Sequence, residues 1–366
     1  MKLKKVFTFI FICFLVTLSA SCGKKEDKSS ENKIGSKEKV NESSKRKIKD
    51  LSGAEIEIPA VKDINRVVII SPAIISPYVS ALKDTSKIVG MHPWIISQSN
   101  VEILQELVPN YKNINTSFIK GFVSNSEEIM KLNPDIIFYW GKGHKQGLEN
   151  VKVPMVDFFT KDTDVEVWSV KAYELICDIF EADNKNDLKE EWLRANNQVK
   201  EMLKNKSSKK KGLMIFQNTG EKILVRGRNN YGDDWLKRTG LVNAAESVEG
   251  DGVEVNFEQI YQWNPDIVYF FRGVPRDKYL KNEIPGQNWS EITAFKNKDI
   301  YEIPLSLFTW FSPQTDAPLA SVWYTMKNYP ELMKENDFKE YMKKFYKNMY
   351  NIELTDKLID DILRNK

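Results

Sequence analysis

One segment that occurs twice in the chain constrains its fold more than any other feature. Residues 127–140 read EEIMKLNPDIIFYW, and residues 258–271 read EQIYQWNPDIVYFF. Each copy predicts a short amphipathic helix that ends at Asn-Pro, because the residue before proline disfavours helical backbone, and then a buried parallel strand. Two copies far apart in one chain indicate two similar α/β lobes. The alternative is that a helix–Asn-Pro-Asp–strand connection has recurred by chance.

The residues that follow the two copies are the first candidates for a binding site. In an open parallel α/β lobe, ligands bind beyond the carboxyl ends of the strands. The first copy is followed by residues 141–144 and the second by Arg272 and Gly273. We therefore expect these two strand ends to line a cleft.

Composition narrows the class of protein. A length of 366 residues suggests about two domains, and a net charge of +3 gives no indication of nucleic-acid binding. Cys13, Cys22 and Cys177 are too few for a disulfide framework, and we expect Cys177 to be a core residue. Two histidines exclude a histidine-rich metal cage. No intrinsic cofactor is expected.

The N-terminus has the features of a secretory signal peptide. Three lysines within residues 1–5 precede the apolar run 6–20, which is shorter than the roughly 20 residues that span a bilayer. Small residues then precede Cys22, as at a bacterial lipoprotein cleavage site, so we predict that Cys22 is lipidated. Ser19 occupies the position where such sites usually have a large aliphatic residue. Cleavage after Ala20 by ordinary signal peptidase is therefore the alternative.

The remaining chain divides by composition into four parts. Residues 22–47 are polar and form a solvated tether, which cannot bury enough apolar surface to fold. We assign residues 48–160 to an N-terminal α/β lobe, 161–208 to a helical bridge and 209–366 to a C-terminal α/β lobe. The bridge contains one long helix, predicted from Asp187 to Lys204, which is a candidate rigid strut.

Several short motifs carry a family resemblance in their order and spacing. They are Asp50-Leu51-Ser52-Gly53 with Ile58-Pro59, residues 65–68, residues 88–90, both Asn-Pro-Asp strands, residues 240–245, Trp289 to Tyr301, and residues 329–331. From residue 48 onward, the chain resembles the substrate-binding proteins of bacterial ABC importers for ferric siderophores, haem and vitamin B12.

The resemblance implies a fold, a location and partners. The fold would be two Rossmann-like α/β lobes joined by a long rigid α-helix, with the ligand in the cleft between them. The protein would be an extracytoplasmic monomer, anchored to the membrane by its N-terminal lipid. It would deliver its ligand to a permease and an ATPase, and it would not be an enzyme.

Charged and aromatic residues near strand ends supply the predicted ligand contacts. Arginine suits anionic ligands because its planar fork makes paired hydrogen bonds, and aromatic rings stack on flat ligands. The expected contacts are Arg272, Trp140, Trp94, His92, Arg226, Arg228, Tyr231, Trp310 and Tyr139. The alternative roles are solvated turn charges for Arg226 and Arg228, lobe core for the tryptophans, and helix packing for Tyr231.

The two histidines are candidate metal ligands. His92 lies in Met-His-Pro-Trp at a strand end, and His144 follows the first repeated strand. A lone histidine is more often structural, so both alternatives stay open.

The predicted function is binding of an anionic, aromatic iron complex, with a ferric siderophore as the first candidate. Haem, cobalamin and a nickel or cobalt complex are the alternative ligands, and a surface adhesin is the alternative class. Nitrogenase-like enzymes share a repeated-lobe arrangement but need several cysteine ligands. The sequence also lacks a Gly-x-Ser-x-Gly elbow, a Walker loop and a His-Glu-x-x-His motif.

Overall fold

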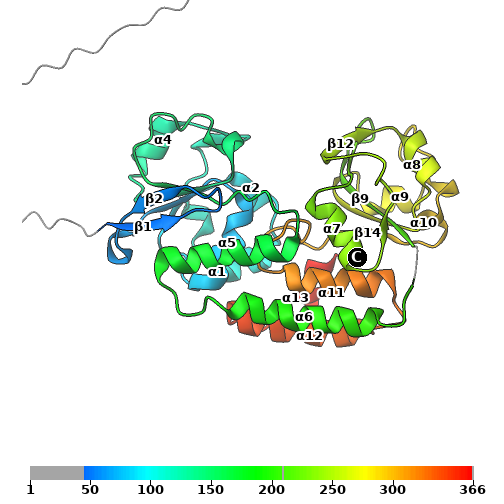
Figure 1. Ribbon diagram of the computed structural model, residues 1–366. Coiled ribbons are helices and arrows are strands. Elements are labelled where there is room, and N and C mark those ends of the chain that lie inside the picture. The colour runs from blue at the N-terminus through cyan, green and yellow to red at the C-terminus, as the bar shows by residue number, and fades with distance from the viewer. Residues whose placement is uncertain (1–44, 208–209, 365–366) are drawn as a thin grey trace, which may run out of the picture. The chain divides into compact units, whose positions relative to one another are not determined.

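The computed structural model describes residues 45–207 and 210–364, so the predicted signal peptide, Cys22 and most of the predicted tether lie outside it (Figure 1). The first strand already begins at Arg46, inside the range predicted as tether. The elements up to the second lobe are β1 Arg46–Lys49, β2 Glu55–Ile58, η1 Val61–Asp63, β3 Val67–Ile69, η2 Pro72–Ile74, α1 Ile75–Leu82, β4 Ile88–Met91, α2 Pro93–Ser97, α3 Val101–Leu107, η3 Tyr111–Asn113, β5 Ile119–Lys120, β6 Val123–Ser124, α4 Ser126–Lys131, β7 Ile136–Tyr139, η4 Lys142–Lys145, β8 Met155–Asp157, α5 Val165–Phe180 and α6 Asp187–Leu203.

The second lobe continues directly from α6. Its elements are β9 Lys211–Asn218, β10 Ile223–Arg226, α7 Tyr231–Arg238, β11 Val242–Asn243, β12 Asp251–Val255, α8 Phe257–Trp263, β13 Ile267–Gly273, α9 Arg276–Leu280, η5 Trp289–Glu291, α10 Thr293–Lys296, β14 Ile300–Glu302, α11 Ala317–Asn328, α12 Glu335–Tyr350 and α13 Asp356–Leu363.

The N-terminal lobe is built on a parallel sheet with strand order β4-β3-β7-β8. All residues of β3 and β7 are buried, as expected for strands covered on both faces. The antiparallel hairpin β1–β2 lies beside this sheet, where the Leu51 amide donates to the Asp157 carbonyl at 3.0 Å. The hairpin therefore closes the lobe next to the end of β8.

The C-terminal lobe has a mixed sheet with strand order β12-β10-β9-β13-β14, and β11 also pairs with β9. Strands β9, β13 and β14 are parallel, whereas β10 is antiparallel to both β9 and β12. The sequence did not predict β12. Only its last residue is fully buried, so it lacks the apolar signal of a central strand.

Both Asn-Pro-Asp segments have the same structural role, which is to end a helix and to anchor a neighbouring strand. Asn133 and Asn264 have φ of 47° and 45°, the left-handed conformation that ends a helix. The carboxylate of Asp135 accepts a hydrogen bond from the Asn65 amide at 2.7 Å, and Asp266 accepts one from the Lys211 amide at 2.7 Å. Each aspartate thus fixes the start of the neighbouring strand, and the predicted two-lobe α/β fold is confirmed.

Some predicted boundaries differ from the structure. Asn125 caps α4, because its side-chain oxygen accepts from the Glu127 and Glu128 amides at 3.0 and 3.1 Å. Asn186 occupies the position before α6 but makes no capping hydrogen bond. The sequence analysis also missed α13, which is only two turns long.

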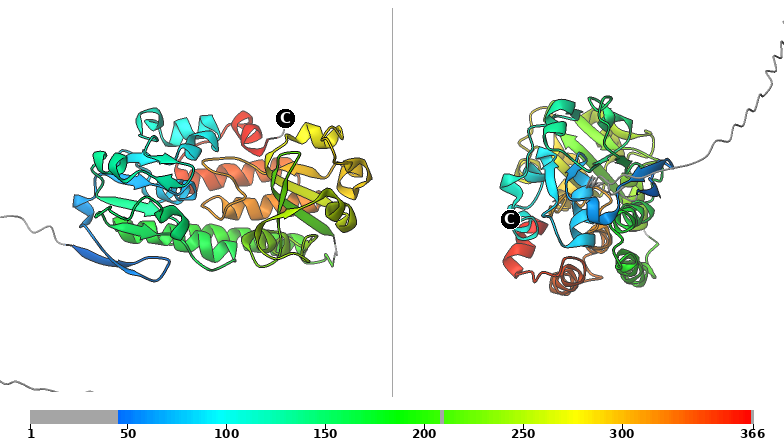
Figure 2. Two further views of the ribbon diagram at one scale, coloured as in Figure 1. Left: turned by 90° about the horizontal axis from the view of Figure 1, so that it is seen from above. Right: turned by 90° about the vertical axis from the view of Figure 1, so that its left-hand side faces the viewer.

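A layer of helices runs along one side of both lobes and joins them (Figure 1). Helices α5 and α6 lie alongside α11 and α12, as the green and orange ribbons of Figure 2 show. The Ser76 hydroxyl of α1 is 2.8 Å from the Tyr350 hydroxyl of α12. The hydrophobic cluster that contains Ile58 and Leu363 includes residues of both lobes, each lobe has a further cluster of its own, and the described residues belong to one compact unit. The last helices therefore contact both lobes, whereas the sequence assigned them to the C-terminal lobe alone. The rigidity of the bridge stays a prediction.

No helix in the described part of the chain has both the length and the apolar character needed to cross a bilayer.

Candidate functional site

The strand ends of the two lobes meet at a cavity of about 190 Å³, which we call the cleft. The N-terminal side and the bridge contribute Ser71, Pro72, Ala73, Trp94, Phe122, Trp140, His144 and Trp168 to its lining. The C-terminal lobe contributes Tyr231, Asp251, Phe308, Ser312 and Pro313. Three of the predicted contacts, Trp94, Trp140 and Tyr231, line this cavity, as does the candidate metal ligand His144.

Arg226 lies at the end of β10, directly behind Tyr231. Only 3 % of Arg226 is exposed, and its guanidinium carbon is 4.5–4.6 Å from the ring centroids of Phe216, Tyr231 and Phe311. It donates to the Tyr231 hydroxyl at 2.5 Å and forms an ion pair with Asp251. Burial lowers the pKa of Arg226, and the neighbouring Arg272 lowers it further.

Arg272 lies near the end of β13, as the repeat predicted. Its guanidinium carbon is 4.4 Å from the Phe216 ring centroid and 5.0 Å from that of Trp94, which belongs to the other lobe. Its Nε is buried and has no hydrogen-bond partner, and burial lowers the pKa of Arg272. No carboxylate among the described residues pairs with Arg272. An anionic ligand would supply the missing partner.

Aromatic rings form most of the cleft wall. The ring centroids of Trp140 and Trp168 are 4.3 Å apart, and those of Trp168 and Tyr231 are 5.3 Å apart. Phe122 lies 4.9 Å from Trp94 and stacks on His144 at 4.5 Å with an interplanar angle of 10°. The Trp168 indole N–H is buried without a partner and is a further possible donor to a ligand.

Sequence reasoning missed Trp168 and Phe122. Trp168 is in the first turn of α5, in a segment assigned to the bridge, and only its offset from the apolar helix face could have indicated another role. Phe122 sits between the two-residue strands β5 and β6, where no periodicity exists to interpret.

The two histidines differ in their capacity to bind a metal. His92 is fully buried; its Nδ1 accepts from the Trp94 amide at 3.0 Å, and its Nε2 donates to the Gly121 carbonyl at 2.8 Å. His92 is therefore a helix cap with no free lone pair in this arrangement. His144 has a buried Nδ1 without a partner, and burial lowers its pKa to about 4. It is thus neutral near pH 7.

Six of the predicted contacts do not line the cleft: Arg226, Arg272 and His92, described above, and also Arg228, Trp310 and Tyr139. Arg228 is exposed and pairs with Glu249 at 2.6 Å, because the chain leaves the sheet after Arg226. Trp310 is fully buried and donates to Asp316 at 3.2 Å. Tyr139 is also buried and lines a second cavity, which is described below.

Metal ligands are not clustered in the described residues: no group of three or more His, Cys, Asp and Glu side chains is arranged to hold an ion. A metal in the cleft would therefore arrive with its own ligands.

Two α/β lobes with a ring-lined cleft between their strand ends, and two arginines packed against rings of that lining, define a bilobal solute-binding protein. The chain belongs to the periplasmic binding protein family, whose sequence model matches residues 79–307. Its solved neighbours are class III members, and such proteins are extracytoplasmic solute-binding components of ABC importers, not enzymes.

Individual relatives are distant but match over most of their length. The molybdate-binding protein MolA of Haemophilus influenzae is 23 % identical over 334 residues, which are 83 % of this chain and 91 % of MolA. A periplasmic solute binding protein from Veillonella parvula has a TM-score of 0.74 and 26 % identity, covering 88 % of this chain and 97 % of that one. CeuE of Helicobacter pylori has a TM-score of 0.69 and 21 % identity, with coverage of 87 % and 99 %.

Proposed function

We propose that this protein captures a compact anionic metal complex in the cleft, with a ferric siderophore as the first candidate, and delivers it to a membrane permease and its ATPase. The proposal rests on one observation, which is that Arg272 is a partly buried cation without a partner of opposite charge among residues 45–207 and 210–364. Its guanidinium is surrounded by rings, its Nε has no partner, and no described carboxylate neutralises it. A half-buried cation of this kind favours an anionic guest.

The aromatic wall supports a ligand with flat or ring-bearing groups. Trp94, Phe122, Trp140, Trp168 and Tyr231 all line the cleft. Rings of this kind give large contact areas and stack on other aromatic systems. Catecholate-type iron chelates combine such rings with negative charge, so they match both features.

The volume of the cleft favours small members of this class. Ligand pockets usually measure about 300–1,000 Å³, and this cleft measures about 190 Å³. Haem or cobalamin would require the lobes to move farther apart than a chelate with one or two rings would.

A second candidate ligand is a tetrahedral oxyanion such as molybdate. The small volume of the cleft favours it, and the similarity to molybdate-binding MolA supports it. A nickel complex is the third candidate, because CeuE has been solved with Ni-His bound.

We also propose that Cys22 is lipidated and anchors the protein to the outer face of the cell membrane. Residues 22–44 would then tether the folded part, which begins at β1, to that anchor. The arrangement would keep the cleft within reach of the permease.

A titration with a ligand panel tests the proposed function. Tryptophan fluorescence and calorimetry would be followed while a ferric bis-catecholate, molybdate, Ni-His, haem and cobalamin are each added to the folded protein. We expect saturable one-to-one binding of the ferric chelate and weaker or no binding of haem and cobalamin. Saturation by molybdate alone would establish the second candidate, and no binding of any anionic member would refute the proposal.

A further inference from the structure

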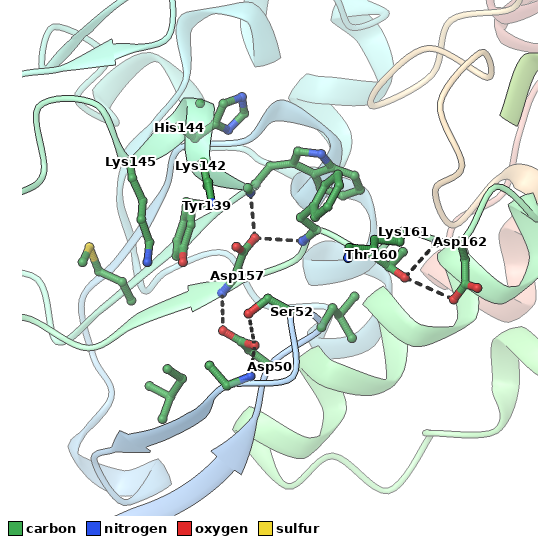
Figure 3. A pocket seen from close by; sticks show the side chains of 18 residues that line it. Asp50, Ser52, Tyr139, Lys142, His144, Lys145, Asp157, Thr160, Lys161 and Asp162 are labelled. Atoms are coloured by element: carbon green, nitrogen blue, oxygen red, sulfur yellow. Dashed lines mark hydrogen bonds between the residues drawn. The ribbon is translucent and has the colours of Figure 1, made fainter. Parts of the chain in front are cut away.

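We infer that a second cavity, on the outer side of the N-terminal lobe, binds a small aromatic carboxylate or catecholate that carries no metal. This outer pocket has a volume of about 1250 Å³ and is shown in Figure 3. Its walls are the β1–β2 turn, the segment Tyr139–Lys145 that follows β7, and the segment Asp157–Asp162 that follows β8. The inference does not depend on which ligand occupies the cleft.

The Asp157 carboxylate connects two walls of the outer pocket by accepting a backbone amide from each of them. The Asp157 carboxylate accepts from the Gly141 amide at 2.7 Å and from the Phe159 amide at 2.9 Å. Below it, Asp50 accepts from the Ser52 hydroxyl at 2.7 Å and from the Ala54 amide at 2.9 Å. These two carboxylates therefore have donors within the protein and do not need to attract a cation.

The lysines around the outer pocket, in contrast to its carboxylates, lack a partner of opposite charge among the described residues. Lys142, Lys145 and Lys161 all line it, and in the part of the chain that the structure describes none of them forms an ion pair with a carboxylate. The Lys145 ammonium lies 5.0 Å from the centroid of the Tyr139 ring. Figure 3 shows Lys145 and Lys161 on opposite sides of the pocket. Asp162, the remaining carboxylate of the lining, pairs with Lys171 at 2.6 Å.

The outer pocket also offers apolar surface. Phe159 is 39 % exposed, and its ring lies 6.1 Å from that of Trp140 at an angle of 87°. Leu51, Ile56 and Met155 complete the apolar lining. Unpaired cations beside an exposed ring recognise an anion that has an aromatic body, rather than inorganic phosphate or an aliphatic acid.

The outer pocket and the cleft share two residues. Trp140 and His144, both in the segment that follows β7, line both cavities. A guest in the outer pocket therefore contacts a tryptophan that also forms part of the cleft wall. We expect binding at either site to change the fluorescence of Trp140.

The test uses the folded protein with salicylate as the probe, followed by calorimetry and ligand-observed NMR. The double variant Lys142→Ala/Lys161→Ala removes two cations of the outer pocket, whereas Arg272→Ala removes a cation that contacts the cleft residue Trp94 and does not line the outer pocket. Lys152→Ala is the matched control, because Lys152 is an exposed lysine of the same lobe that does not line the pocket. Benzyl alcohol has the ring without the charge, and acetate has the charge without the ring, so the two compounds test these features separately.

We expect the double variant to weaken salicylate binding by about fivefold or more, while Arg272→Ala and Lys152→Ala leave it unchanged. Acetate and benzyl alcohol should bind more weakly than salicylate. Binding that is lost in Arg272→Ala but kept in the double variant would assign salicylate to the cleft and overturn the inference. Equal losses in Lys152→Ala, or no saturable binding to the wild type, would also overturn it. Thermal unfolding of each variant confirms that the fold is intact.

Discussion

Replacing Arg272 by alanine is the sharpest test of how the cleft binds its ligand. The guanidinium sits between Phe216 of its own lobe and Trp94 of the other lobe, at 4.4 and 5.0 Å from their ring centroids. Because no described carboxylate neutralises Arg272, removing it takes away a positive charge without exposing a buried negative one. The loss should therefore appear mainly in ligand binding and only weakly in stability.

The expected loss of binding free energy in Arg272→Ala depends on how buried the guanidinium is and on which charges lie near it. Truncating one partner of a buried, hydrogen-bonded charge pair costs about 2–5 kcal/mol of binding free energy. Arg272 is only half-buried, and Arg226 remains nearby, so we expect the lower end, about 2 kcal/mol, or roughly a 30-fold rise in Kd. Loss of the contact between Arg272 and the Trp94 ring changes this balance by only about 1 kcal/mol.

Calorimetric titration with a ferric bis-catecholate at low and moderate salt measures this effect. Arg272→Lys keeps the charge but loses the planar fork, so its affinity should lie between those of wild type and Arg272→Ala. Arg228→Ala is the matched control, since Arg228 pairs with Glu249 on the surface. An unchanged Kd for Arg272→Ala, or an equal loss in Arg228→Ala, would refute the assignment of Arg272 as the anion contact.

Three further predictions concern stability, pH and anchoring. Gly273→Ala should lower the free energy of unfolding in urea by at least about 2 kcal/mol, because φ is 111° and a Cβ would lie 1.8 Å from the Asn218 carbonyl oxygen; an unchanged midpoint would contradict this. Burial lowers the pKa of His144 from 6.5 to about 4, so its contribution to stability is complete above pH 6.5 and is lost as the pH falls toward 4. The variant His144→Phe should therefore show a smaller loss of stability than wild type between about pH 7 and pH 5, and an identical loss would count against it. Cys22→Ser should release the protein from the membrane fraction into the soluble fraction, whereas retention would show that another feature anchors it.

The tertiary structure corrected several expectations for identifiable reasons. Arg226 and Arg228 are two residues apart at the same turn, and the sequence gives no reason to treat them differently. Only Arg226 lies in strand β10, so Arg226 is buried behind Tyr231 whereas Arg228 is solvated. Trp310 follows a strand, yet it packs into the core because Asp316 and Ser306 accept its indole N–H at 3.2 Å. His92 became a helix cap because Pro93 begins α2 immediately after it.

The sequence by itself determined the two-lobe α/β fold and the position of Arg272. These features depend on local rules: Asn-Pro ends a helix, an apolar run forms a buried strand, and ligands collect beyond the ends of parallel strands. Only the tertiary structure decided which rings surround the arginines, since Trp94, Trp168 and Phe216 come from segments far apart in the chain. Only the folded N-terminal lobe reveals the outer pocket, because the hydrogen bond between Asp157 and Gly141 brings the loops that carry Lys142 and Lys161 to the same cavity.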